Sequence, residues 1–130
     1  MNGMNTSVLA RHVLRIGLGL TFVWMGLLIW QSPELYAAFL SPWAQQFVGD
    51  SAVTLKAVAA FDLVMGVLLI SGLLTWVVAL LVSVHLLGVL IGMGNLSDVA
   101  ARDFGLLAAS LCLLFWSWSR KVGSDQSGGR

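Results

Sequence analysis

The sequence has few charged residues, and this shortage excludes several classes of protein. Lys, Arg, Asp and Glu make up only 10% of the 130 residues, against about 25% in a typical soluble domain. The formal net charge is +1, so the chain has no strong electrostatic field that would attract nucleic acid. A chain with so little polar surface is not expected to stay dissolved as a globule.

Cysteines and enzyme motifs are scarce as well. The single cysteine, Cys112, excludes a disulfide and CxxC chemistry within one chain. There is no GxGxxG, Walker, HExxH or GxSxG motif, so nothing indicates a nucleotide-dependent enzyme or a hydrolase. The first residues lack a basic cluster, and no A-x-A site closes the first apolar run. We therefore expect that run to be a retained helix and not a signal peptide.

Hydrophobic residues, in contrast, reach 58% of the chain and gather in long runs. A helix needs roughly 20 apolar residues to cross about 30 Å of hydrocarbon. The uncharged stretch 63–97 would be about 50 Å long as one helix, so it must fold back on itself. Ser71 and Gly72 mark the best place for that break. The sequence therefore predicts an all-α bundle of four transmembrane helices, at 13–30, 52–70, 74–93 and 103–118.

The segments outside these runs have patterns of their own. Residues 1–12 and 119–130 are mostly polar, and we predict a cytoplasmic amino-terminal segment and a disordered cytoplasmic tail. Ser32 and Ser41 each precede a proline, the pattern of an N-cap followed by proline at the first helical position. We predict two short helices at the membrane interface between the first and second spans. The alternative is an ordinary connecting loop packed on the bundle.

Basic residues are distributed unevenly between the two ends of the predicted bundle. The end with the chain termini carries five and the opposite end two: Arg11, Arg15, Arg120, Lys121 and Arg130, against Lys56 and Arg102. By the positive-inside rule, both termini are predicted to be cytoplasmic. Gly88 and Gly92 form a GxxxG pair in the third span, which is typical of close helix packing within a bundle or between two copies.

Two ionisable residues fall inside the predicted spans, Asp62 in the second and His85 in the third. They lie about 11 and 12 residues from the turn, which places both roughly 16–18 Å from that end of the bundle. A lone carboxylate at this depth is costly. We therefore predict that Asp62 contacts His85, either as a structural pair that fixes helix register or as a functional pair.

Cys112 has the same expected depth as this pair. Asp, His and Cys side chains together can ligate a metal, but cysteine is more often a small apolar filler, so no metal is predicted. Haem bound by His85 would need a second histidine, such as His85 of a second copy, because His12 lies at the membrane surface. Asp103 is predicted to cap the last helix. The weaker candidates for the site are Cys112, Arg102, Asp103 and Arg15.

Three stretches carry a resemblance to a known family. They run from Leu14 to Leu20 and on to Met25-Gly26, from Asp62 to Gly66 and on through Leu68 to Thr75, and from Arg102 to Ala109. In their order and spacing they resemble the DoxX/DoxD-like family of small four-helix integral membrane proteins. The resemblance implies a subunit of the prokaryotic cytoplasmic (inner) membrane, linked to quinone-coupled sulfur oxidation, to quinol oxidation or to oxidative-stress complexes. Family members often carry a lysine after the first-helix glycine, whereas Leu27 follows Gly26 here, and His85 then becomes the available partner of Asp62.

Three functions remain open at this point. The first is a redox-associated accessory subunit, at most a quinone-linked or non-catalytic part of an oxidoreductase complex, in which Asp62 and His85 handle protons. It would hold no cofactor within the chain, with quinone as the candidate ligand, and would associate with a redox partner or with its own copies. The second is a small carrier in which the same residues line a polar path across the bilayer. The third is a membrane scaffold without chemistry.

Overall fold

The computed structural model describes residues 6–48, 51–94 and 98–127. Within these ranges the chain is helical and forms no strand; its helices are α1 (Thr6–Gln31), α2 (Pro33–Ala37), α3 (Pro42–Val48), α4 (Ser51–Ser71), α5 (Thr75–Met93) and α6 (Asp98–Ser127). The four long helices, α1, α4, α5 and α6, are each long and apolar enough to cross a membrane. The predicted four-helix architecture is confirmed.

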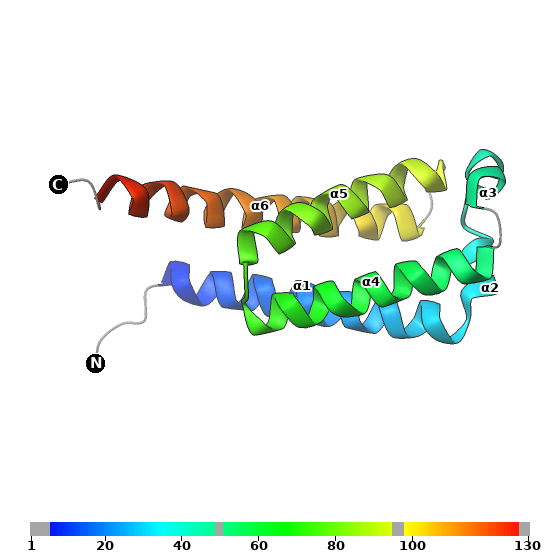
Figure 1. Ribbon diagram of the computed structural model, residues 1–130, viewed down its shortest axis with the longest axis horizontal. Coiled ribbons are helices and arrows are strands. Elements are labelled where there is room, and N and C mark those ends of the chain that lie inside the picture. Colours follow the sequence, from blue (N-terminus) through cyan, green and yellow to red (C-terminus); the bar gives the residue numbers. More distant parts are fainter. Residues whose placement is uncertain (1–5, 49–50, 95–97, 128–130) are drawn as a thin grey trace.

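The long helices form a pair of layers. α1 packs mainly on α4, and α5 packs mainly on α6, with fewer contacts between the layers. Figure 1 shows that α1 begins and α6 finishes at one end of the bundle, on the side of the α4–α5 turn, whereas α2 and α3 lie at the other end. We call these the terminal end and the cap end.

Glycines bring α1 and α4 together. A side-chain carbon added at Gly66 would lie 2.7 Å from the carbonyl oxygen of Gly19, and one added at Gly19 would lie 2.8 Å from that of Gly66. The predicted glycine pair behaves differently, because a carbon added at Gly88 or Gly92 would meet nothing within 4 Å. Both glycines line an open space in this structure, and their part in packing within the bundle stays a prediction. Their contact with a second copy stays a prediction.

The break between the second and third spans is confirmed at the predicted residues. α4 ends at Ser71, and Gly72 and Leu74 have positive φ angles of 80° and 46°. Glycine suits the first position because it has no side chain to clash in the left-handed region. Glycine is also required sterically, because the Arg15 guanidinium occupies the position that a Cβ atom of residue 72 would take.

The first and last long helices extend further than predicted, at three of their ends. α1 begins at Thr6 and not at residue 13, and α6 begins at Asp98 and not at Asp103. Asp103 therefore lies inside the helix and is 4% exposed, so the acid in the first turn is Asp98. The predicted disordered tail is helical as far as Ser127, while residues 128–130 lie outside the described part. Polar residues other than glycine and proline cost a helix less than about 1 kcal/mol each, so a polar stretch need not end it.

A continuous apolar core fills the half of the bundle nearer the terminal end. It consists of buried residues from all four long helices: Leu18, Phe22, Met65, Leu69, Val78, Ala79, Val82, Leu86 and Leu113. Beside it, Ser83 of α5 and Ser110 of α6 share a buried hydrogen bond of 2.8 Å between their hydroxyl oxygens. Each hydroxyl also lies within hydrogen-bond distance of a carbonyl oxygen of its own helix, Ala79 for Ser83 and Leu107 for Ser110, so the two buried polar groups are satisfied.

Candidate functional site

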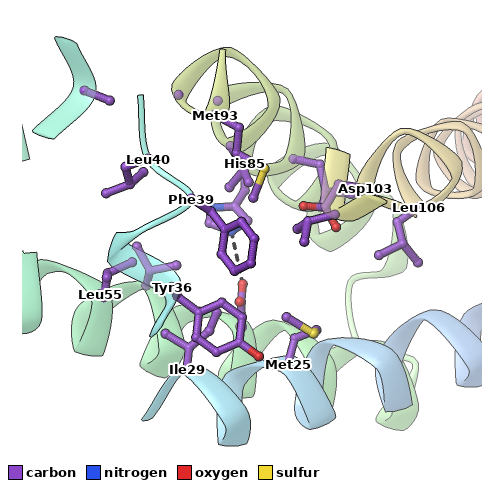
Figure 2. Close-up of a pocket in the computed structure, with 18 of the residues that line it drawn as sticks. Met25, Ile29, Tyr36, Phe39, Leu40, Leu55, His85, Met93, Asp103 and Leu106 are labelled. Carbon is purple, nitrogen blue, oxygen red and sulfur yellow. Dashed lines mark ion pairs between the residues drawn. The ribbon is translucent and has the colours of Figure 1, made fainter. Parts of the chain in front are cut away.

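The other half of the bundle holds a smaller apolar cluster, Ile29, Leu55 and Ala59, beside a hollow. A cavity of about 460 Å³ lies between the two layers, toward the cap end. Figure 2 shows its wall of aliphatic and aromatic side chains from both layers and from the segment that carries α2. The labelled wall residues include Met25, Ile29, Tyr36, Phe39, Leu40, Leu55, Met93 and Leu106. A cavity of this size is typical of small-molecule sites, which fall in the range of about 300–1,000 Å³.

Asp62 and His85 meet at this cavity, which confirms the predicted contact. Asp62 Oδ1 lies 3.1 Å from His85 Nε2, and the two side chains come from different layers. Asp62 is only 4% exposed. Its Oδ1 receives no directed hydrogen bond from the described residues, so this oxygen has acceptor capacity to spare. The rings of Phe61 and His85 have centroids 4.8 Å apart, so Phe61 restricts the movement of the imidazole on one side.

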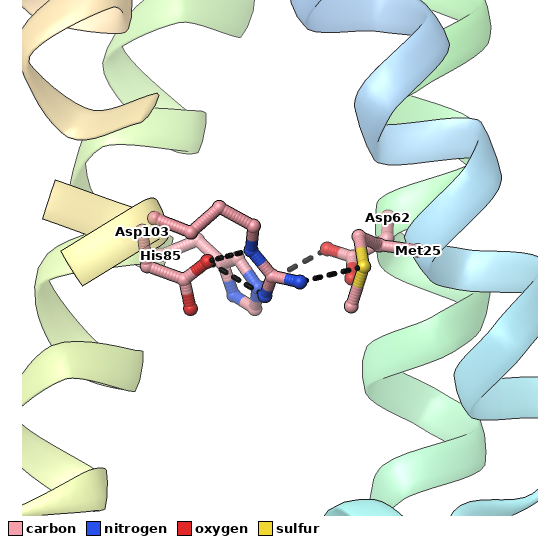
Figure 3. A network of polar contacts seen from close by, with 5 residues as sticks. Met25, Asp62, His85 and Asp103 are labelled. Atoms are coloured by element: carbon pink, nitrogen blue, oxygen red, sulfur yellow. Dashed lines mark hydrogen bonds and ion pairs between the residues drawn. The ribbon is translucent and has the colours of Figure 1, made fainter. Parts of the chain in front are cut away.

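A second pair of opposite charges reaches the same cavity. Arg102 donates from Nε and from a terminal nitrogen to Asp103 Oδ1, at 2.9 Å and 2.8 Å. The other terminal nitrogen lies 3.1 Å from the sulfur of Met25 on α1. Figure 3 shows Asp103 and His85 projecting from one layer toward Asp62 and Met25 on the other. Arg102 and His85 therefore both bridge the layers.

The chemistry of the cavity follows from these four polar side chains. The imidazole of His85 and the guanidinium of Arg102 supply N–H donors, while the carboxylates of Asp62 and Asp103 accept hydrogen bonds or protons. Both acids are nearly enclosed by apolar walls, where an unpaired charge is costly. Such a site suits an apolar molecule that carries hydrogen-bonding oxygen atoms and exchanges protons.

The weaker candidates separate into two groups. Arg102 and Asp103 join the Asp62–His85 pair at the cavity. Arg15 does not, because it lies beside Gly72 at the terminal end, and Cys112 is exposed on the outer surface of α6. Within the described residues, no group of three His, Cys, Asp or Glu side chains is arranged to hold a metal ion. Cys112 was expected at the same depth as Asp62 and His85, but its helix face points away from them, so equal depth was not sufficient for contact.

The segment between α1 and α4 covers the cavity at the cap end. Its prolines begin α2 and α3 as predicted, but the serines before them do not cap. Ser32 makes no capping hydrogen bond, and the Ser41 hydroxyl donates instead to the Gly92 carbonyl oxygen of α5, at 2.7 Å. The Ser41 amide donates to the same oxygen at 3.0 Å. These bonds hold the cover against the second layer.

The sequence did not predict that the segment between α1 and α4 contributes residues to the cavity wall. The sequence placed this segment at the membrane interface, yet these of its large apolar residues line the cavity: Tyr36, Phe39, Leu40, Trp43 and Phe47. Trp43 is also about half exposed, at 47%, and Phe47 is mostly exposed, at 84%. Their helical spacing was the available signal, but spacing does not tell a face toward lipid from a face toward a cavity.

The comparisons with known proteins agree with the resemblance noted in the sequence. The family model described as DoxX matches residues 10–95, which extend from α1 to just beyond α5. The matched range includes Asp62 and His85 and stops before Arg102 and Asp103. The comparisons with curated proteins and with solved structures gave no match.

Proposed function

The chain belongs to the DoxX family of multi-pass membrane proteins, and from this we propose that it is a redox-associated subunit that binds a membrane quinone in the cavity. The observation that carries the proposal is the buried Asp62–His85 pair at the wall of an apolar cavity of about 460 Å³. The proposed location is the prokaryotic inner membrane with both termini cytoplasmic. A partner oxidoreductase or further copies of the chain would complete the assembly.

The fit of a quinone rests on the wall chemistry. The headgroup is a flat apolar ring with two carbonyl oxygens, and the aromatic and aliphatic wall suits such a ring. Asp62 Oδ1 is buried and receives no directed hydrogen bond from the described residues. That oxygen is an acceptor available to a hydroxyl of the reduced ring, while His85 and Arg102 are donors available to the carbonyl oxygens.

A bound quinone would supply two-electron, two-proton redox chemistry, with the electrons exchanged with the partner. The role proposed for Asp62 and His85 is to hold and pass protons between the ring and the cap end. Their contact of 3.1 Å is within the distance for direct transfer between imidazole and carboxylate. Arg102, held by Asp103 and Met25, would orient the ring and keep the layers at a fixed spacing.

The carrier hypothesis has less support. A path across the bilayer would have to continue from the cavity to the terminal end, and the apolar core around Leu69 and Leu113 occupies that half. Both side chains are 0% exposed. A pocket closed at one end favours binding over permeation.

Binding can be tested with purified protein in lipid nanodiscs and a short-tailed quinone analogue. The informative variant is Gly88→Leu, because Gly88 lines the cavity and a Cβ atom added there would have nothing within 4 Å. The matched control is Gly17→Leu, which also has open space but lies outside the cavity. We expect Gly88→Leu to weaken quinone affinity at least tenfold by filling the cavity, with no change for Gly17→Leu.

Two outcomes would contradict the proposal. One is the absence of saturable quinone binding to the native chain. The other is equal affinity in the native chain, in Gly88→Leu and in Asp62→Asn. Equal losses in Gly88→Leu and Gly17→Leu would mean that bulk in the membrane, and not occupancy of the cavity, controls binding.

A further inference from the structure

A second feature lies at the terminal end, away from the cavity. The guanidinium carbon of Arg11 on α1 lies 4.9 Å from the ring centroid of Trp116 on α6, and that of Arg120 lies 5.1 Å from the same ring. Each contact is within the distance of a cation–π interaction. Two positive charges from different layers are therefore held against one indole.

Arg15 adds a third cation close by. It lies one helical turn after Arg11 on the same face of α1. One of its terminal nitrogens lies 3.3 Å from His12 Nδ1, and the guanidinium lies against Gly72 of the α4–α5 turn. We call Arg11, Arg15 and Arg120 the arginine cluster.

The arginine cluster has no carboxylate partner in the part of the chain that the structure describes. The ion pairs found there, Asp62 with His85 and Arg102 with Asp103, both lie at the cavity. The Nε atoms of Arg11 and Arg15 are buried, and neither donates a hydrogen bond to any acceptor among the described residues. Like charges that are packed together and partly desolvated are unfavourable until an anion joins them.

The position of the cluster suits a lipid headgroup. Asp62 lies near the middle of the bundle, and nine further residues of α4 lead to Ser71. At 1.5 Å per residue, the α4–α5 turn lies about 14 Å from the Asp62 level, close to half the thickness of the hydrocarbon layer. Arg15 at this turn is therefore at the depth where phosphate groups of the bilayer begin.

We infer that the arginine cluster is a binding site for the phosphate headgroup of an anionic phospholipid. Arg11 and Arg15 donate to the phosphate oxygens through their terminal nitrogens, since guanidinium groups match phosphate geometry. Trp116 of α6 contacts Arg11 from the other layer and Arg120 from its own helix. A headgroup bound to these arginines therefore links α1 to α6. Those layers have few contacts of their own.

Native mass spectrometry of the detergent-purified chain tests this site. The probes are phosphatidylglycerol and phosphatidylcholine with identical acyl chains. We expect one retained phosphatidylglycerol and at least tenfold weaker retention of phosphatidylcholine. Arg11→Gln combined with Arg15→Gln should reduce phosphatidylglycerol retention about tenfold. The control is Lys56→Gln, which removes one positive charge from an exposed lysine of α4 near the cap end and should change nothing.

The single variant Arg120→Gln, at an exposed position, provides a second test if the double variant does not fold, with an expected loss of at least threefold. Equal retention of both lipids, or an equal loss in Lys56→Gln, would overturn the inference. Full displacement of the lipid by millimolar inorganic phosphate would overturn it too, since the site would then belong to a soluble anion. Quinone binding is measured separately at the cavity, so failure of either proposal leaves the other standing.

Discussion

The two halves of the bundle are built from the same four helices yet differ in how they use their interior. Toward the terminal end, aliphatic side chains such as Leu69 and Leu113 are completely buried in a continuous core. Toward the cap end, glycines and small gaps leave a cavity of about 460 Å³ whose wall carries four ionisable groups. The filled half buries more apolar side chains than the cap-end half, so we expect it to contribute more to stability, while the cavity offers space for a ligand.

The largest expected effect tests whether stability resides in the filled half. Leu113→Ala removes a side chain with 0% exposure and should cost about 3 kcal/mol of unfolding free energy, because a cavity forms that the core cannot close. The counterpart in the hollow half is Leu40→Ala, which only widens an existing cavity and should cost less than about 1 kcal/mol. Unfolding of each variant in mixed detergent, followed by circular dichroism, checks the difference. Equal losses would abolish the distinction between the halves.

A second test compares two glycines of different surroundings. Gly66→Ala places a methyl group 2.7 Å from the Gly19 carbonyl oxygen and should cost about 2 kcal/mol, because α1 and α4 must separate. Gly88→Ala adds the same methyl group where nothing lies within 4 Å and should leave stability unchanged within about 0.5 kcal/mol. The same unfolding assay measures both. A stable Gly66→Ala would show that the layer tolerates a wider spacing.

The Asp62–His85 pair lies between the two halves of the bundle. A third test therefore measures how strongly the two side chains stabilise each other. A double-mutant cycle with Asp62→Asn and His85→Gln should give a coupling energy of about 1.5 kcal/mol, since the atoms are 3.1 Å apart and buried. The unfolding assay, run on the native chain and three variants, measures this coupling. Additive single effects would mean that the contact contributes nothing, and the proposed proton pair would lose its structural basis.

The smallest effect concerns the buried serines of the filled half. Ser83→Ala removes a hydrogen bond of 2.8 Å to Ser110, and the expected cost is about 0.6 kcal/mol, as for other interhelical bonds in membranes. The cost is small because Ser110 keeps its bond to the Leu107 carbonyl oxygen. Ser119→Ala, an exposed serine with only a bond within its own helix, is the control. A loss above about 2 kcal/mol would assign the serines a larger role in holding α5 to α6.

Much of the fold could be predicted because it depends on local properties of the chain. The length of each apolar run determines whether it can span hydrocarbon, and the left-handed Gly72 marks the break. Helix ends were less accurate, since α6 extends to Ser127 through polar residues that neither require nor forbid a helix. The shared depth of Asp62 and His85 was predictable because counting residues from one turn gives the depth of both, and the cost of an unpaired buried carboxylate favoured their contact.

The membrane environment, the number of spans and the shared depth of Asp62 and His85 could be obtained from the sequence, since they follow from composition and from the constant rise of a helix. Only the tertiary structure decided how each helix is rotated about its axis. That rotation directs Asp103 into the cavity and Cys112 to the outer surface, although neither depth nor residue type distinguishes a facing side chain from one turned away. Rotation depends on packing between helices distant in sequence, where Gly19 meets Gly66 and Ser83 meets Ser110.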